Sequence, residues 1–191
     1  MFLFLMIFSG ILSADDQFEH QGAARAGYFF FSNSDARKIY DQGAPTLELE
    51  YKYWFLPRYA VWTNLNVIWA SGKTKALSST SHITMTTTSV GVQEFFPCRR
   101  GRLKPYVGFG MTIAYVRTKD HTDYLPQTTV RWSLGCVGKL GALFLFSERI
   151  FGDFFFDYYY QPTRTRKSGS FSDDFIDLGG GRIGWATGYR F

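Results

Sequence analysis

The feature that most constrains the fold is a two-residue alternation of apolar and charged side chains. From Leu47 to Tyr53 the odd positions are apolar or aromatic and the even positions are charged. Successive side chains of a β-strand point to opposite faces of the sheet, so this segment has one apolar face and one ionic face. The alternation predicts a strand, but it leaves open which face is the inside.

The same alternation recurs along the chain. Between Val107 and Tyr115 one face carries large apolar residues and the other carries Gly, Thr or Ala. Small residues that face a narrow interior leave room for longer side chains from neighbouring strands. We expect eight strands, at residues 24–32, 46–55, 60–70, 83–95, 104–117, 127–141, 150–161 and 175–191.

The connections between these segments alternate in length. Short ones lie near residues 56–59, 97–103 and 147–149, and long polar ones cover residues 33–45, 71–82, 118–126 and 162–174. This alternation along an even number of antiparallel strands is typical of transmembrane barrels, whose long loops are extracellular. The sequence therefore predicts an all-β fold, a closed antiparallel up-and-down eight-stranded transmembrane β-barrel.

Composition favours the membrane over a soluble barrel. The chain has 20 Phe, 12 Tyr and 5 Trp in 191 residues. The interior of an eight-stranded barrel is just wide enough for side chains, so aromatic rows from every strand do not fit inside it. With polarity inverted, aromatic residues face lipid, and Gly, Ala, Ser and a few charges face inward. A closed sheet also satisfies the backbone hydrogen-bonding groups, as lipid requires.

Charges on the expected inner face need partners, because an unpaired buried charge is costly. Four acidic and four basic residues fall there, and we interpret them as an ion-pair network that plugs the lumen: Glu48, Glu50, Lys52, Arg131, Asp153, Asp157, Arg182 and Arg190. A water-filled pore is then not expected. The alternative interpretation is a solvated polar core without a gating role.

The N-terminus predicts an export signal. Phe2 to Leu12 is an apolar run of the length of a signal-peptide core, and it is too short to span a bilayer, which takes about 20 residues. We expect a signal peptide at residues 1–14, cleaved after Ala14, and a barrel domain at residues 15–191. No Lys or Arg precedes the run, so either the α-amino group supplies the charge or the true start lies upstream. An N-terminal anchor or a buried strand is the alternative.

The last segment, Ile183 to Phe191, ends in Phe and has apolar residues at alternate positions, with Thr187 less apolar than the rest. On this segment, and on the aromatic segments 27–31 and 153–160, the chain resembles small outer-membrane β-barrel proteins of the OmpA, OmpX and OmpW type. The resemblance implies a bacterial outer-membrane location. It also implies an assembly signal that the barrel-assembly machinery recognises, carried by Ile183, Trp185, Tyr189 and Phe191. No peptidoglycan-binding domain follows in this sequence, so that OmpA-type role is not expected.

Basic residues fall in all four long loops: Arg37, Lys38, Lys73, Lys75, Arg117, Lys119, Arg164, Arg166 and Lys167. At an outer rim they would meet the phosphates of lipopolysaccharide, which Arg forks bind well, although loop solubility accounts for them equally. A second cluster, Arg99, Arg100, Arg102 and Lys104, falls at a short turn, near inner-leaflet headgroups. The net charge of +5 is scattered, so lipids and lipopolysaccharide are expected partners and nucleic acid is not.

Catalytic signals are weak. A nucleophilic pair needs a base within hydrogen-bond reach of a hydroxyl, and nothing in the sequence fixes that geometry around His20, His82 or His121. No Cys/His spacing suits zinc and no glycine loop suits phosphate, so we expect no metal, cofactor or catalytic residue. We expect a monomeric, non-enzymatic barrel acting in envelope integrity or surface interaction. The alternatives are a membrane-embedded lipid-modifying hydrolase or acyltransferase, or a narrow channel for small or hydrophobic solutes.

Overall fold

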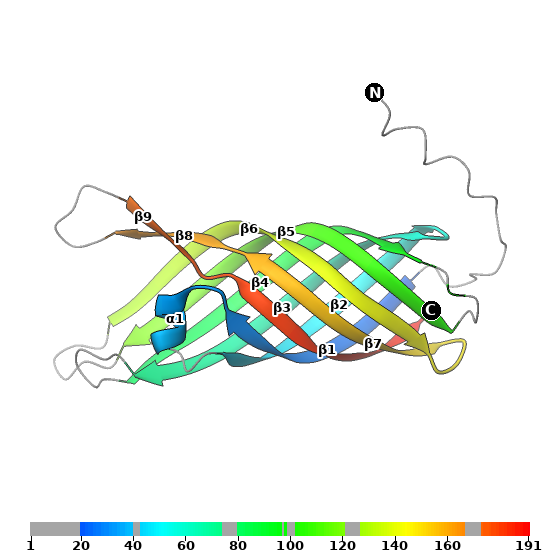
Figure 1. The fold of residues 1–191 in the computed structure, drawn as a ribbon, viewed down its shortest axis with the longest axis horizontal. Coiled ribbons are helices and arrows are strands. Elements are labelled where there is room, and N and C mark those ends of the chain that lie inside the picture. Colours follow the sequence, from blue (N-terminus) through cyan, green and yellow to red (C-terminus); the bar gives the residue numbers. More distant parts are fainter. Residues whose placement is uncertain are drawn as a thin grey trace, which may run out of the picture.

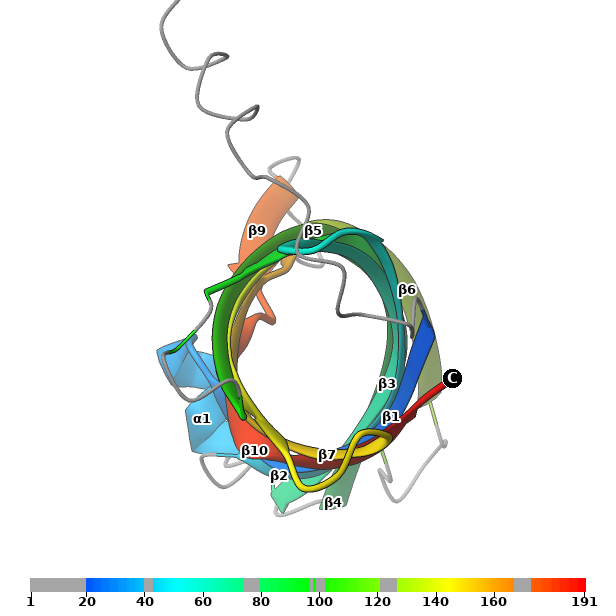
Figure 2. The same ribbon diagram turned by 90° about the vertical axis from the view of Figure 1, so that its right-hand side faces the viewer.

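The computed structural model describes residues 20–39, 43–73, 80–96, 98, 102–120, 127–166 and 173–191, so the expected signal peptide lies outside the described residues. Eight strands form one closed antiparallel barrel (Figures 1 and 2). They are β1 (His20–Phe31), β2 (Ala44–Leu56), β3 (Tyr59–Lys73), β4 (Thr80–Phe95), β5 (Leu103–Asp120), β6 (Gln127–Leu145), β7 (Ile150–Tyr160) and β10 (Gly180–Arg190). The predicted fold class is confirmed.

The barrel closes between its first and last strands. β1 pairs antiparallel with β10, from Gln21 opposite Arg190 to Phe31 opposite Gly180. At the end of this seam the His20 N–H donates to the Phe191 carbonyl (3.3 Å), and the Phe191 N–H donates to the His20 carbonyl (3.0 Å). The seam therefore ends at the rim that carries the short turns, which is the periplasmic rim in barrels of this topology.

Two loops contain secondary structure that the sequence did not predict. A helix, α1 (Ser34–Ile39), follows β1, and the Asn33 side-chain oxygen caps it by accepting from the Ala36 N–H (3.3 Å). A hairpin of β8 (Pro162–Arg166) and β9 (Asp173–Asp177) projects from the loop end of the barrel (Figure 1). The last barrel strand consequently begins at Gly180 rather than at residue 175, because residues 173–177 pair with β8.

The outer face is apolar, as predicted. Leu49 and Met111 are 66% exposed and Trp132 is 69% exposed. The middle of the strands carries mostly aliphatic side chains, together with Phe109, Phe154, Phe156 and Trp185, and the other exposed aromatic side chains gather towards both ends. Those near the loops are Tyr28, Phe30, Trp69, Trp132, Tyr158 and Tyr160, and those near the turns are Tyr53, Phe55, Phe96, Phe146, Tyr189 and Phe191. This is the apolar band between two aromatic girdles that a lipid bilayer requires.

No helix in the described part of the chain has the length and hydropathy needed to cross a membrane.

The lumen also holds aromatic rings. Trp62, Phe155 and Tyr159 are almost fully buried inside the ring. Two of these rings lie over glycines of other strands: a Cβ built on Gly91 of β4 or Gly110 of β5 would lie 2.7 Å from Trp62, and one built on Gly184 of β10 would lie 2.7 Å from Phe155. The expectation that small inner residues leave room for long side chains is confirmed, and these three rings lie on the inward face of their strands, opposite the apolar rows.

Candidate functional site

Eight charged side chains meet in the middle of the lumen, and we call them the lumen ion cluster. The four bases are Arg25, Lys52, Lys139 and Arg182, and the four acids are Glu48, Glu50, Asp153 and Asp157. The exposed fraction of their side chains in these pairs is 0–1%. Their charges therefore balance within a site that is closed to bulk water.

Arg25 of β1 contacts three of the four carboxylates. Its Nη1 lies 2.5 Å from Glu48 Oε1, 3.0 Å from Glu50 Oε2 and 3.3 Å from Asp157 Oδ2. The guanidinium carbon also stands 3.8 Å from the centroid of the Phe155 ring. An aromatic face attracts a cation, so the ring holds Arg25 in place without competing for its hydrogen bonds.

Arg182 of β10 completes the partners of Glu48. Its Nη1 lies 2.5 Å from Glu48 Oε2, and its Nη2 bonds to Asp157. Glu48 therefore binds one arginine through each carboxylate oxygen. Opposite charges this close attract strongly in a site removed from water.

The two lysines bind the other side of the cluster. Lys139 Nζ bonds to Glu50 and stands 3.7 Å from the centroid of a Trp62 ring. Lys52 Nζ lies 2.9 Å from Glu50 Oε1 and 3.9 Å from Asp153 Oδ2. Since Lys139 is on β6 and Glu50 on β2, their bond crosses the lumen, and the Lys52–Asp153 pair joins β2 to β7, so distant walls of the barrel are tied together.

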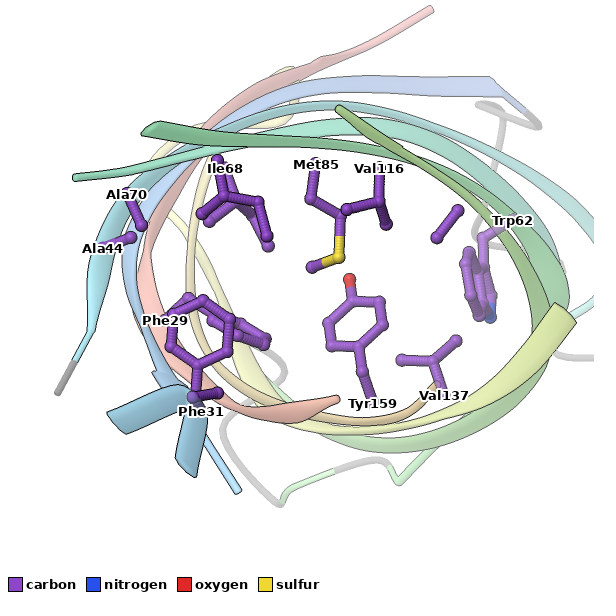
Figure 3. Close-up of a cluster of buried hydrophobic side chains, with 13 residues drawn as sticks. Phe29, Phe31, Ala44, Trp62, Ile68, Ala70, Met85, Val116, Val137 and Tyr159 are labelled. Atoms are coloured by element: carbon purple, nitrogen blue, oxygen red, sulfur yellow. The ribbon is translucent and has the colours of Figure 1, made fainter. Parts of the chain in front are cut away.

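A hydrophobic cluster extends from the loop end of the lumen to Trp62 beside the ion cluster, and we call it the apolar cap. It includes Phe29, Phe31, Ala36, Ala44, Trp62, Ile68, Ala70, Ile83, Met85, Ala114, Val116, Val137 and Tyr159. Figure 3 shows the Tyr159 ring and the Met85 side chain pointing towards one another across the ring of strands. Ala36 belongs to α1, so the helix of the first loop packs against this cluster from beside the ring of strands (Figure 2).

The structure places the eight predicted lumen residues as follows. Six lie in the ion cluster: Glu48, Glu50, Lys52, Asp153, Asp157 and Arg182. Arg131 is half-buried near the loop end of β6, eight residues or about 26 Å of strand from Lys139. Arg190 is buried at the opposite end. With the Gln21 amide oriented so that its oxygen faces the N–H donors around it, Arg190 Nε donates to that oxygen at 3.2 Å.

Arg25 and Lys139 are the cluster members that sequence reasoning missed. Lys139 lies on the same face of β6 as Arg131, and counting in twos from Arg131 reaches it. Arg25 lies on β1, where residues 28–31 are all aromatic. The alternation of apolar and polar residues is therefore unclear on this strand. The missed signal in both cases was strand parity.

The predicted loop bases come from the loop end of the barrel. Arg37 and Lys38 are on α1, Lys73 ends β3, Arg117 and Lys119 are near the end of β5, and Arg164 and Arg166 are on β8. Lys75 and Lys167 lie outside the described residues. These elements surround one rim (Figure 1).

The predicted assembly residues Ile183, Trp185, Tyr189 and Phe191 lie on the outer face of the last strand or just after it, 40–56% exposed. Phe191 stacks on His20 (ring centroids 5.8 Å apart), and Tyr189 accepts a hydrogen bond from Arg149 Nη1 (3.0 Å). The C-terminal segment therefore contributes to the aromatic girdle at the turn rim.

The histidines are spread over the molecule. His20 Nδ1 bonds to the Tyr51 hydroxyl (2.6 Å) at the turn rim. His82 is exposed on β4, opposite Ser71 and Lys119, and His121 lies outside the described residues. In the described part of the chain no group of His, Cys, Asp or Glu side chains is arranged to hold a metal ion.

Comparison with known proteins identifies the fold. No family model and no curated protein matches the chain. Among solved structures, OprG of Pseudomonas aeruginosa has a TM-score of 0.64 at 14% identity, over 91% of this chain and 97% of that one. Ail of Yersinia pestis, in complex with a heparin analogue, has a TM-score of 0.57 at 14% identity, over 91% and 99%. Neisserial surface protein A has 0.55 at 11%, over 90% and 95%.

Three features define the class of the protein: a closed ring of eight strands, an apolar outer band with two aromatic girdles, and buried charged side chains inside the ring. It is a small transmembrane β-barrel of the bacterial outer membrane, as the sequence predicted. Its fold is that of OprG, Ail and Neisserial surface protein A, and at identities of 11–14% the likeness extends to the fold alone.

Proposed function

We propose that the protein is a non-conducting, non-enzymatic barrel that acts in envelope integrity or surface interaction through its four extracellular loops. The observation that carries this proposal is the filling of the lumen by two different layers. One is the lumen ion cluster, and the other is the apolar cap. Each layer opposes the passage of solute for its own physical reason.

The ion cluster carries no excess charge that would attract a permeating ion. Its four acids and four bases are bonded mostly to each other, and Phe155, Trp62 and Tyr106 pack against its cations. A passing ion would have to replace bonds such as that of Lys52 to Glu50 (2.9 Å). Leaving a buried charge without its partner is strongly unfavourable.

The apolar cap acts on water. Phe29, Ile68, Met85 and Val116 are at most 3% exposed, and they line the end of the lumen that faces the loops. A constriction of apolar side chains excludes water and is a barrier to hydrated ions. The two layers lie in series along the barrel axis.

Conductance across a planar bilayer tests the closed lumen. We expect the wild-type barrel to give no stepwise current above the leak. A variant with Phe29→Ala and Tyr159→Ala, which empties part of the apolar cap, should conduct more than a control with Phe30→Ala and Tyr158→Ala, whose rings face outward. Substantial single-channel current from the wild type would overturn the proposal in favour of a channel.

The proposed contact with lipopolysaccharide involves the outer face of β5. Arg117 is exposed there, between Thr84 of β4 and Val130 of β6. Just below it Tyr115 and Trp132 pair edge to face, with ring centroids 5.0 Å apart. Aromatic rings of a girdle sit at headgroup level, so Arg117 stands at the height of the lipopolysaccharide phosphates. A guanidinium binds phosphate through paired hydrogen bonds.

A lipopolysaccharide-binding assay tests this contact. A variant with Arg37→Gln and Arg117→Gln should retain less lipopolysaccharide in detergent than wild type. A control with Arg58→Gln and Arg149→Gln, at the opposite rim, should retain as much as wild type. Equal retention by both variants would refute the loop contact. Turnover of labelled lipid A that is lost in His82→Ala would instead favour the lipid-modifying enzyme.

The C-terminal segment supports assembly by the barrel-assembly machinery. Trp185, Tyr189 and Phe191 present an apolar row outward. Deletion of Phe191 should lower insertion into the outer membrane of cells while leaving refolding in detergent intact. Normal insertion of the deletion variant would argue against an assembly signal.

A further inference from the structure

The turn rim carries three arginines that are held in the same way. Arg58 lies between β2 and β3, Arg102 precedes β5, and Arg149 precedes β7. The carbonyl of each accepts a backbone hydrogen bond from the neighbouring strand, from Phe95, Leu145 and Arg190 respectively, at 2.8 Å in every case. The sheet therefore fixes the backbone of all three arginines at the end of the barrel.

Their side chains project from this fixed backbone. Arg58, Arg102 and Arg149 are exposed. Arg149 Nη1 donates to Tyr189 Oη (3.0 Å), which uses one of the five guanidinium donors. The three arginines therefore lie at the same level of the barrel, at the ends of its strands.

That level is the boundary between lipid tails and headgroups. Phe55, Phe96 and Phe146 belong to the same turns and are 44–65% exposed. In outer-membrane barrels aromatic residues form girdles at both interfaces, and this girdle is the one on the periplasmic side. The three arginines therefore stand beside the phosphates of the inner leaflet.

The charge at this rim is predominantly positive. Lys104 adds a fourth base, 5.3 Å from the centroid of a Trp54 ring. The acidic side chains of the described turns and strand ends are Glu94 and Glu148, and Glu94 accepts a hydrogen bond from the Tyr59 hydroxyl (3.1 Å). Arg99 and Arg100, between β4 and β5, lie outside the described residues.

We propose that Arg58, Arg102 and Arg149 form a binding rim for anionic glycerophospholipids of the inner leaflet. Exposed cations attract lipid phosphate, and a headgroup with net negative charge is favoured over a zwitterionic one by the surplus of bases. This site is at the opposite end of the barrel from the proposed lipopolysaccharide contact, so either proposal can fail without the other.

Lipid selection in nanodiscs tests the proposal. The wild-type barrel is placed in discs of equal parts phosphatidylglycerol and phosphatidylethanolamine, and the lipids that stay bound are counted by native mass spectrometry. We expect phosphatidylglycerol to be enriched. Near an anionic surface each basic residue contributes about 1 kcal/mol, or about fivefold in binding, so the enrichment should fall by up to about fivefold for each arginine replaced by glutamine.

Two controls make the outcome decisive. The triple variant with lysine at all three positions keeps the charge and should keep the enrichment, and heat-modifiable gel mobility verifies that each variant is folded. The proposal is overturned if wild type shows no preference, if the glutamine variant keeps it, or if the lysine variant loses it too. Displacement of the lipid by millimolar inorganic phosphate in detergent would also overturn it, since the site would then serve the free anion.

Discussion

Replacing Arg25 by Met should destabilise the barrel by about 3–5 kcal/mol, because removal of one partner leaves a buried charge without compensation. Arg25 contacts Glu48, Glu50 and Asp157 within 3.3 Å, and its side chain is 0% exposed. Without it, four carboxylates face three bases in the lumen ion cluster. Met keeps much of the side-chain volume, so the loss reports charge rather than a cavity.

Because the loss of stability comes from unbalanced charge, a second substitution that removes one carboxylate should restore part of it. Glu48→Gln in the Arg25→Met background restores the balance at three acids and three bases. The double variant should be more stable than the sum of the two single effects by about 0.5–3 kcal/mol, the range for groups in direct contact. Arg117→Met, on the exposed outer face, is the matched control and should change stability by at most about 0.5 kcal/mol.

Urea unfolding of the barrel in lipid vesicles, followed by tryptophan fluorescence, measures these free energies. The reasoning is refuted if Arg25→Met is as stable as Arg117→Met. It is also refuted if the effects of Arg25→Met and Glu48→Gln simply add, because the carboxylates would then not depend on the arginine.

Two further pairs of substitutions probe the interior and the outer face with the same unfolding assay. Gly110→Ala should cost about 1–3 kcal/mol, since the new Cβ would lie 2.7 Å from Trp62. Gly138→Ala should be neutral, since a Cβ there meets nothing within 4 Å, and equal effects would contradict the packing argument. Met111→Arg, at the middle of the apolar band, should cost about 2–4 kcal/mol, against at most about 1 for Phe146→Arg near the turn rim. A larger cost at Phe146 would contradict the assigned membrane position.

The faces of the strands were predictable from the sequence because a strand has only two of them. Once Leu47 and Leu49 are assigned to lipid, Glu48 and Glu50 must face inward. A slip of one residue would turn every charge towards the hydrocarbon. The same logic placed Asp153 and Asp157 inside, and strand parity extended along β6 would have placed Lys139 there too.

The partners of these charges were not predictable from the sequence. Arg25 on β1 meets Asp157 on β7, although β10 lies between the two strands. Lys139 on β6 meets Glu50 on β2 from the far side of the ring. Such contacts depend on the stagger and tilt with which the sheet closes, and no single strand encodes these.

The packing of the inner aromatic residues and the loop structure escaped prediction for related reasons. Trp62 fits inside because Gly91 and Gly110, on two following strands, lie under its ring. That space exists only once three strands are in register. Residues 173–177 form β9 and pair with β8, so they do not extend β10. The alternation of apolar residues looks the same in a barrel strand and in a strand outside the membrane, so the sequence could not separate the two.

The ion pairs that cross the lumen also affect the order in which the barrel folds. Arg25 and Asp157 are 132 residues apart in the chain, and Lys139 and Glu50 are 89 apart. In a half-wound sheet the two walls that carry these charges are not yet opposed, so each ion keeps its hydration shell. Water leaves the interior only when the first strand meets the last. Expulsion of that water and completion of the ring are therefore a single event, and the barrel matures as one unit rather than hairpin by hairpin.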